Sequence, residues 1–561
     1  MTDHEKALRS VECQVLDRHH LQFPLLQRNT NDAIAALLRC YGDVVRGLRK
    51  GSIPKDSDNA NHETANEGFR GLAHCLRWIR SNCPHLITVP SPGDGQLQRE
   101  ALELLRWGVK YDPLCNQHIA YSRNVNGTRW VDADVNESGK TITFLPRDDI
   151  NPQFFVSQVE ARKADDERQG ALYPDQRLSE LSKAWFQSAR VAGTQLQFDD
   201  RLIESSGALE VAIDWLHKSL LPELSEDSQL GGFSARALRR VLAALHVACL
   251  FRVRFEDSSD SMPEGEPHVR THVLSWKVDD LINWLHAITA VKQSELRSIV
   301  ELFIFDNEPD RVTSAHKPLI LGASDRVFLS PRLFLALPLS QMVVGAANLN
   351  PVSKEAYNNV STQIATAVVN SIAEKIRIGC LTNARNVRER SFQLPDQSTI
   401  SPDLIVLSTD GTELLVIDVK NAMPPFGVAD IVNDLKEWDE KWQPQLNRYV
   451  TAFRDHPDIL SQHFDGGPFQ PSAVFGLILL RWPFPVPARP SSDCGAIDWP
   501  TLLQNLAGEA DCRTISELYN WILERPDVAL VESLQWEQKQ VEVGEWTYQY
   551  PVLAASSGES H

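Results

Sequence analysis

The chain has 561 residues, of which 42% are hydrophobic and 23% are charged. That balance is ordinary for a globular protein and excludes wholesale disorder, and the length suggests several domains of roughly 100–200 residues each. The 74 acidic and 56 basic side chains give a formal net charge of −18. This charge disfavours a protein that coats polyanions over its whole surface, because binding phosphates needs local positive charge. We therefore expect any nucleic-acid site to be confined to a patch.

No apolar run approaches the ~18 residues that a membrane-spanning helix needs, since the longest runs, such as 475–480, have the length of a strand. The first ten residues, MTDHEKALRS, are polar and charged, unlike a secretory signal. The 9 cysteines include no Cys-x-x-Cys pair, which favours reduced thiols. We therefore expect a cytoplasmic protein that does not contact a membrane.

The first two thirds of the chain are predicted to be mostly helical. Residues 1–170 form one expected domain, with a β-hairpin near 118–146, where two alternating segments flank Asn-Glu-Ser-Gly. Residues 171–345 form a second expected domain, helical and regulatory or interacting, with two short strands between 318 and 337. Its function is not readable from the pattern.

Two patterns in this region suggest ligand sites, and both are rejected. Ser138-Gly139-Lys140-Thr141 resembles the end of a phosphate-binding loop, but Asp134 stands where the first glycine must be, and a strand follows instead of a helix. The histidines and cysteines at 74–85 fit no common zinc spacing.

Residues 346–482 carry a sharper pattern and form the third expected domain. The expected elements are a long helix at 353–379, strands at 386–394, 403–408 and 413–420, a helical pair at 428–455 interrupted at Pro444, and a strand at 473–482. Their order is helix, three strands, helix, strand. The fourth part, 483–561, begins with a proline-rich linker and holds a helix near 513–525.

Two carboxylates are expected to meet in this region. Asp410-Gly411 between two β-rich runs is a strong hairpin signal, and a two-residue type I′ loop there places Asp403 directly opposite Asp418. Their Cβ atoms would be about 4.5–5.5 Å apart, and like charges so placed destabilise a sheet unless something lies between them. A divalent cation is the obvious candidate. Lys420 projects from the same face, because side chains alternate along a strand.

The remaining side chains of this hairpin are apolar on both faces, so we expect it to be central and covered by helices on both sides. A buried strand pair that ends in two carboxylates and a lysine is costly as structure. It makes sense as a functional site at the end of a sheet.

Pro402-Asp403 and Asp418-Val419-Lys420 resemble the two halves of the signature of the PD-(D/E)XK nuclease superfamily, which has the restriction-endonuclease-like fold. Each half recurs elsewhere in the chain, but only these two are joined by a strand, a tight turn and a strand in register. The order of elements over about 130 residues, 353–482, also matches the family core. The resemblance implies an α/β fold, a mixed sheet flanked by helices, appended to a large, mostly α-helical N-terminal region with small β elements.

RecB-type members of this family carry Gln-x-x-x-Tyr on the following helix, and QLNRY, Gln445 to Tyr449, has that spacing here. Residues four apart share one helical face, so both side chains are expected to reach the site. Pro444 directly precedes the glutamine, which departs from a single continuous helix.

The resemblance implies a site for Mg²⁺, with Mn²⁺ as a substitute, that supports phosphodiester hydrolysis. Asp403, Asp418 and the backbone carbonyl of Val419 would hold the ion through hard oxygen ligands, and the ion would polarise the phosphate and lower the pKa of a bound water. In the family an acidic residue on the first helix often joins the metal ligands, and Glu374 is the best candidate here.

The same resemblance assigns Lys420 to orient the water or to offset developing negative charge. Gln445 and Tyr449 complete the expected catalytic set. Four arginines between the first helix and the first strand are candidates for contacts with substrate phosphates, and a solvated charged face explains them equally well: Arg377, Arg385, Arg388 and Arg390.

The leading interpretation is a Mg²⁺-dependent DNA endonuclease of a bacterial restriction or phage-defence system. A RecB-type recombination or repair exonuclease stays open, as does a non-catalytic scaffold with a nuclease fold, against which the three retained site residues argue. An ATPase or helicase partner for the N-terminal region is a further expectation. A homodimer is expected if both strands are cut, since one such site cuts one strand at a time.

Overall fold

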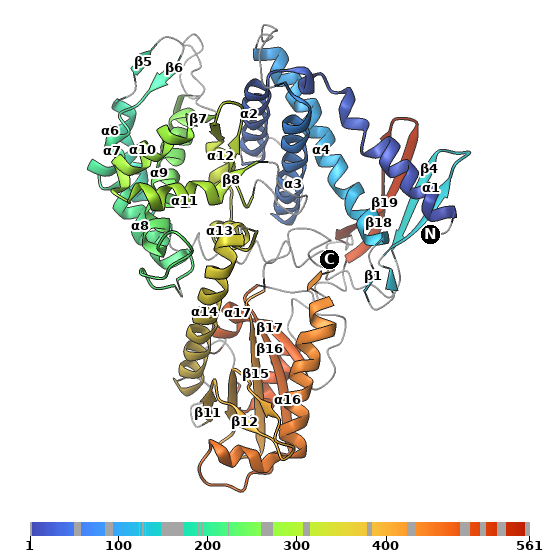
Figure 1. Cartoon of the computed structure of the whole chain (residues 1–561), viewed down its shortest axis with the longest axis vertical. Coiled ribbons are helices and arrows are strands. Elements are labelled where there is room, and N and C mark those ends of the chain that lie inside the picture. The colour runs from blue at the N-terminus through green and yellow to red at the C-terminus, as the bar shows by residue number, and fades with distance from the viewer. Residues whose placement is uncertain are drawn as a thin grey trace, which may run out of the picture. The chain divides into compact units, whose positions relative to one another are not determined.

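Figure 1 shows the computed structural model of the chain, which combines α-helices with mixed and antiparallel sheets, as the predicted α/β class requires. The structure describes residues 3–49, 58–84, 94–122, 124–125, 128–129, 131–146, 173–188, 190–192, 195–222, 224–259, 273–306, 315–349, 351–378, 384–422, 433–434, 436–482, 494–504, 506, 512–523 and 534–555. Two compact units form, Met1–Cys115 with Arg162–Val360 and Asn116–Ala161 with Ser361–His561. The four consecutive domains expected from the sequence stay a prediction.

Unit 1 is mostly helical, as predicted, because its apolar residues recur at helical spacing and are buried on one side of each helix. Its α-helices are α1 (Asp3–Val11), α2 (Thr30–Arg49), α3 (Asp58–Asn82), α4 (Asp94–Ser122, which continues into unit 2), α6 (Asp175–Gln187), α7 (Arg201–Ser205), α8 (Ala208–Ser219), α9 (Ala235–Ser259), α10 (Val278–Thr289), α11 (Gln293–Phe303), α12 (Pro331–Leu335) and α13 (Leu339–Leu349). Short π or 3-10 helices lie at Glu12–Leu16, His19–Gln22 and Pro24–Gln27.

The strands of unit 1 are short. A four-stranded sheet has the order β7 (Leu274–Lys277), β10 (Arg326–Leu329), β9 (Leu319–Leu321) and β8 (Ile304–Phe305), and β5 (Arg190–Ala192) pairs with β6 (Gln195–Gln197). Strands β9 and β10 confirm the two strands expected between 318 and 337. Among the described helices of the whole chain, none is both long and apolar enough to cross a bilayer.

The predicted hairpin near 118–146 is confirmed as β3 (Val131–Asn136) and β4 (Thr141–Pro146) of unit 2. Its turn is closed by Asn136, whose Oδ1 accepts from the N–H of Gly139 at 2.9 Å. The segment therefore forms a hairpin turn and does not lead into a helix, in agreement with the rejection of a phosphate loop. Strand β4 also pairs with β19 (Trp546–Ala555), which pairs with β18 (Leu534–Val543). The sequence did not predict these two strands. A two-residue pair, β1 (Asn124–Val125) and β2 (Thr128–Arg129), lies nearby in the chain.

The larger sheet of unit 2 has the order β11 (Arg385–Arg388), β14 (Leu404–Leu407), β15 (Glu413–Lys420), β16 (Ala473–Leu480) and β17 (Cys494–Asp498). The first three strands are antiparallel neighbours, and β15, β16 and β17 are parallel. Helix α14 (Pro351–Ile378) precedes β11, and α16 (Gln443–Asp455) lies between β15 and β16. The predicted order of helix, three strands, helix, strand is therefore observed, and β17 adds an unpredicted fifth strand.

The β14–β15 hairpin has the predicted register but a different turn. Leu404 pairs with Ile417, as expected, yet Gly411 has a positive φ of 73° and Asp410 does not. The predicted two-residue type I′ loop is therefore wrong. Instead the N–H of Gly411 donates to the carbonyl of Ser408 at 3.0 Å, and Asp410 accepts three hydrogen bonds from its neighbours. The longer loop adds one residue on each side of Asp410-Gly411, so the register is unchanged.

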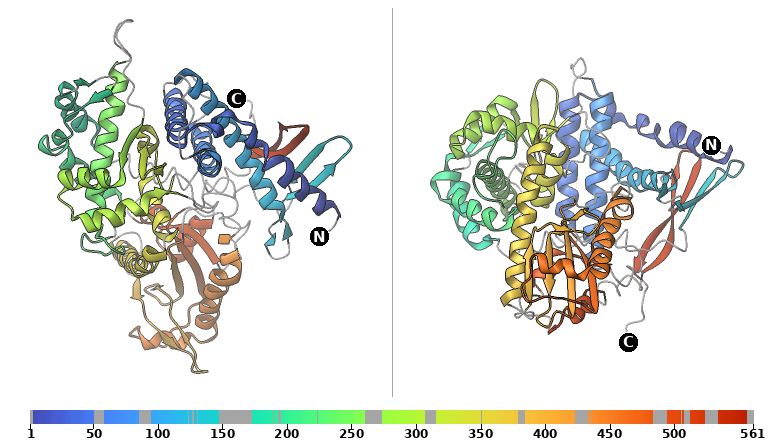
Figure 2. Two further views of the ribbon diagram at one scale, coloured as in Figure 1. Left: turned by 45° about the horizontal axis from the view of Figure 1, so that its top comes forward. Right: turned by 60° about the horizontal axis from the view of Figure 1, so that its bottom comes forward.

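Helices α14 and α16 lie on opposite sides of this sheet (Figure 2). The α16 side holds a core in which Ile405 and Val416 of the sheet pack with Leu446 and Val450 of the helix. Burying each such side chain contributes about 1.5–3 kcal/mol. Two short strands, β12 (Phe392–Gln393) and β13 (Thr399–Ile400), and the 3-10 helix Pro457–Gln462 border this core. Gly476 of β16 lets α16 approach closely.

Helix α18 (Ile515–Leu523), the helix expected near 513–525, begins at the end of the sheet near the β14–β15 turn. Helix α17 (Trp499–Gln504) follows β17 at the opposite end, since Asp498 pairs with Leu480 and Leu480 with Lys420. The carboxylate of Glu413 accepts the N–H of Ile515 at 2.9 Å and also bonds Ser516. Glu413 thus caps α18, and it lies at the opposite end of β15 from Lys420.

We expect Gly476→Ala to destabilise unit 2, because the added Cβ would lie 2.9 Å from Val450 Cγ2 and 3.0 Å from Leu446 Cδ2. Overpacking of this kind costs about 1–3 kcal/mol, measurable as a lower midpoint of urea unfolding. Gly95→Ala is the matched control, since a Cβ there meets nothing within 4 Å. Equal midpoints for the two variants would contradict the close packing of α16 on β16.

Candidate active site

The site lies at one end of the sheet, where strand β15 extends further than its neighbour β14. Strand β14 stops at Leu404, whereas β15 continues to Lys420, so the backbone of Val419 faces past the end of its neighbour. Asp403 replaces the missing strand partner, since its Oδ2 accepts the N–H of Val419 at 2.6 Å. Because the N–H and C=O of one residue point to the same side of a strand, the Val419 carbonyl projects toward Asp403 as well.

The two predicted carboxylates are brought together at this point. Asp418 is 3% exposed, and its Oδ2 accepts no hydrogen bond from any described residue. Burial chiefly, and the charge of Asp418, raise the pKa of Asp403 to about 6, although the Val419 N–H and Lys420 act in the opposite direction. The pair is therefore short of positive charge and of hydrogen-bond donors.

Lys420 supplies the nearest positive charge, with its Nζ 2.7 Å from Asp418 Oδ2. The same Nζ donates to Gln445 Oε1 at 3.1 Å. Lys420, Asp403 and Asp418 all project from the face of the sheet that α16 covers, as the alternation of side chains predicts. The sequence-predicted triad therefore converges at one point.

A directional hydrogen-bond chain links α16 to this point. Gln445 Nε2 donates to the Tyr449 hydroxyl at 2.7 Å, and that hydroxyl donates to the carbonyl of Ser401 at 3.4 Å. Since a carbonyl can only accept and an ammonium can only donate, the chain allows one orientation of the Gln445 amide, with Oε1 facing Lys420. Burial raises the pKa of Tyr449, which keeps its hydroxyl protonated.

Pro444 does not interrupt the helix that carries this pair. It lies in the first turn of α16, directly after the π-helix Trp438–Trp442. The N–H of Gln443 still donates to the carbonyl of Trp438, so the π-helix runs directly into α16, and the missing N–H of Pro444 falls where the hydrogen-bond pattern changes from π to α. The interruption expected at Pro444 is therefore wrong, and Gln445 and Tyr449 share one face.

Glu374 is not brought to the carboxylates. Three hydrogen bonds tie α14 to the other face and edge of the sheet: Ser361 with Asn421, Thr366 with Glu389, and Asn370 with Arg388. Glu374 is exposed, one turn beyond Asn370. Among the described residues, no three His, Cys, Asp or Glu side chains are grouped to hold a metal ion. The prediction for Glu374 is therefore wrong, because helical spacing does not reveal which side of the sheet the helix covers.

The four predicted arginines do not gather at the site. Arg385 lies at the turn end of β11, where it donates to the carbonyl of Asp465 at 2.8 Å and stacks over Phe469. Arg388 bonds Asn370 on the α14 side at 2.8 Å. Neither supports the predicted substrate contact, since both are engaged in holding the fold. The side chain of Arg377 lies outside the described residues.

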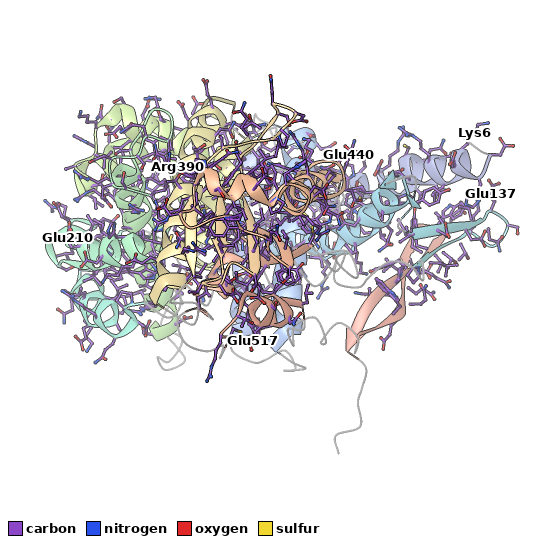
Figure 3. All side chains as sticks on the ribbon, turned by 90° about the horizontal axis from the view of Figure 1, so that it is seen from below. Lys6, Glu137, Glu210, Arg390, Glu440 and Glu517 are labelled. Atoms are coloured by element: carbon purple, nitrogen blue, oxygen red, sulfur yellow. The ribbon has the colours of Figure 1, made fainter. Side chains whose placement is uncertain are left out.

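Arg390 stays a candidate for substrate contact. It is exposed (Figure 3) and precedes Ser391, whose hydroxyl bonds that of Ser401 at 2.8 Å. Sequence reasoning missed Arg448, an exposed arginine that donates to the carbonyl of Thr399 at 3.3 Å. Its place three residues after Gln445, on nearly the same helical face, was the signal that could have found it.

The donor set fits a small, hard divalent cation. Mg²⁺ typically takes one or two carboxylates and fills its remaining positions with water and substrate oxygens. Asp403, Asp418 and the Val419 carbonyl supply such a set, and the buried Oδ2 of Asp418 lacks a donor among the described residues. The structure thus meets the chemical requirement without a third acidic side chain.

No protein-family model matches this chain, and neither the curated proteins nor the solved structures contain a match to it.

We expect the affinity of the site for Mn²⁺ to rise about fivefold between pH 5 and pH 6 and to level off above pH 7, because a cation must displace the proton of Asp403 below its pKa of about 6. The raised pKa also means that, without metal, Asp403 stabilises the fold most below pH 4 and loses that contribution as the pH rises through 6. Calorimetric titration at each pH measures the affinity. A flat affinity from pH 5 to 7 would contradict the raised pKa.

We expect Gln445 and Tyr449 to be energetically coupled, because each is the other's hydrogen-bond partner. Tyr449→Phe, Gln445→Leu and the double variant form a cycle whose coupling energy should be roughly 0.5–1.5 kcal/mol. Urea unfolding of the three variants measures it. Pairing Tyr449→Phe with Glu413→Gln, at the far end of β15, should give additive effects, and equal coupling in both cycles would refute the proposed chain of contacts.

Proposed function

We propose that this chain is a metal-dependent nuclease of the PD-(D/E)XK superfamily, with DNA as its substrate. The observation that supports the proposal is the convergence of Asp403, Asp418 and Lys420 at the end of a buried strand pair, with Gln445 bonded to the lysine. The order of elements around them, helix, three strands, helix, strand, supports a restriction-endonuclease-like core.

The energetic cost of the two carboxylates favours a binding or catalytic role over a purely structural one. Two carboxylates in an apolar environment destabilise the fold unless they are paired with positive charge and hydrogen-bond donors. A hydrophobic pair at Asp403 and Asp418 would extend the surrounding core without this cost. A site that keeps both acids, and leaves one buried oxygen without a donor among the described residues, is better explained by binding chemistry.

Each side chain has a defined part in hydrolysis of a phosphodiester. Asp403, Asp418 and the Val419 carbonyl would hold a cation, which would supply Lewis-acid polarisation and make a bound water more acidic. Lys420 offsets the negative charge that develops on the phosphate oxygens. Gln445 holds the ammonium in place, and Tyr449 orients Gln445.

A DNA endonuclease of a restriction or phage-defence system is the form of this function that we propose, acting in the cytoplasm and, for double-strand cuts, as a homodimer. The support is an analogy: a nuclease core of this size with a large helical region attached suits such an effector, and that region would receive an ATPase or helicase partner. The Gln445–Lys420 contact favours a second candidate, a RecB-type exonuclease.

Cleavage of linear and supercoiled circular DNA by the full chain with Mg²⁺ tests the function. We expect cleavage by wild type, and a loss of roughly 10²–10³-fold in Lys420→Met because the developing charge is no longer offset. Asp418→Asn should lose cleavage activity because the cation loses a carboxylate ligand. Cutting of the circular substrate identifies an endonuclease, whereas activity confined to linear DNA identifies the exonuclease.

Glu413→Gln is the matched control, since it changes an acid on the same strand that caps α18 and lies at the far end from the carboxylates. It should retain cleavage. Protein that binds DNA but leaves it intact with Mg²⁺ and with Mn²⁺ would favour the scaffold interpretation. Cleavage that survives all three substitutions equally would refute the site.

A further inference from the structure

We propose that Lys420 and the divalent cation compete for Asp418, and that Gln445 is the acceptor that retains Lys420 when the cation binds. This inference rests on the proposed function, and it concerns how the site is regulated. Lys420 would then have two positions. In one it neutralises the carboxylate pair when no cation is bound, and in the other it offsets the charge that develops on the phosphate.

The charges at the site favour competition between Lys420 and a cation. Asp403 and Asp418 lie side by side with Lys420 as their nearest cation, and its Nζ is 2.7 Å from Asp418 Oδ2. Asp418 is 3% exposed, so water screens the pair poorly. The ammonium therefore takes the place that a cation would have beside this oxygen. A cation must weaken the ion pair before it can bind with full strength.

The contact between Lys420 and Asp418 is an ion pair without a hydrogen bond. Although Lys420 Nζ is close to Asp418 Oδ2, the geometry is not that of a hydrogen bond, and no other described residue donates to this oxygen. Asp403 differs, since the Val419 N–H donates to its Oδ2 at 2.6 Å. The Oδ2 atom of Asp418 is thus neutralised by charge alone, and a cation that replaces the lysine there breaks no hydrogen bond at this oxygen.

Gln445 offers Lys420 a second, neutral hydrogen-bond acceptor. Gln445 Oε1 lies 3.1 Å from Lys420 Nζ and is turned toward it by the contact between Gln445 Nε2 and Tyr449. An ammonium has three donors, so Lys420 can release Asp418 and keep Gln445. A neutral acceptor does not compete with the cation's own charge. Gln445 therefore keeps Lys420 beside the reacting phosphate after the exchange.

Binding of Mn²⁺ to the full chain, measured by calorimetry without DNA, tests the exchange. We expect Lys420→Met to bind Mn²⁺ roughly 10–100-fold more tightly than wild type, because the positive charge that repels the cation is gone. Lys420→Arg keeps the charge and should not reproduce this gain. Gln445→Leu should bind Mn²⁺ several-fold more weakly, since the ion pair with Asp418 is then the remaining described contact of the Lys420 ammonium.

Thermal unfolding provides a second readout and shows whether each variant folds. In EDTA, Lys420→Met should melt below wild type, because its two carboxylates have lost their cation. Saturating Mn²⁺ should raise its melting temperature by more than it raises that of wild type. Wild-type cleavage with Mn²⁺ is measured in parallel.

The outcomes separate this inference from the proposed function. Mn²⁺ binding and DNA cleavage by wild type, with equal or weaker Mn²⁺ affinity in Lys420→Met, would overturn the exchange and leave the nuclease intact. If neither wild type nor Lys420→Met binds Mn²⁺, the inference falls together with the proposed function. Tighter binding in Lys420→Met that Lys420→Arg fails to reproduce supports the competition.

Discussion

The candidate site of unit 2 depends on two carboxylates that lie beside each other at the end of a buried strand pair. Asp403 and Asp418 repel one another, and the apolar core around them offers little screening. The neighbouring contacts reduce this cost without removing it: the Val419 N–H, the Lys420 ammonium and, behind it, the Gln445 amide. Because the negative charge of this pair is incompletely neutralised, the site is suited to bind a divalent cation.

Two features of the fold make this placement possible. Because β15 is longer than β14, the backbone N–H and carbonyl of Val419 have no strand partner on that side. The N–H donates to Asp403 instead. The close approach of α16 at Gly476 brings Gln445 within reach of Lys420. The polar chain that ends at the Ser401 carbonyl then selects one orientation of the amide. Strand ends and helix packing thus decide the chemistry as much as the acids themselves.

Local pattern predicted the features that depend on neighbours in the chain. Alternation and the turn residues predicted the register of β14 and β15 even though the turn itself was misjudged, because the longer loop is symmetric about Asp410-Gly411. Helical spacing predicted that Gln445 and Tyr449 share a face. Glu374 and Arg385 could not be judged in this way, since their roles depend on which side of the sheet a helix covers and on a loop 80 residues away.

By itself the sequence determined the buried hairpin, the meeting of Asp403, Asp418 and Lys420, and the mostly helical character of unit 1, because each follows from short-range periodicity or turn chemistry. Only the tertiary structure decided that Lys420 bonds Gln445, that Ser401 anchors Tyr449, and that β4 pairs with β19 from the far end of the chain. Those contacts join segments that lie far apart in the chain. They depend on packing between elements and therefore produce no periodic pattern in the sequence. The physical reason is that a strand or helix specifies which face it presents, whereas its partner is chosen by the whole core.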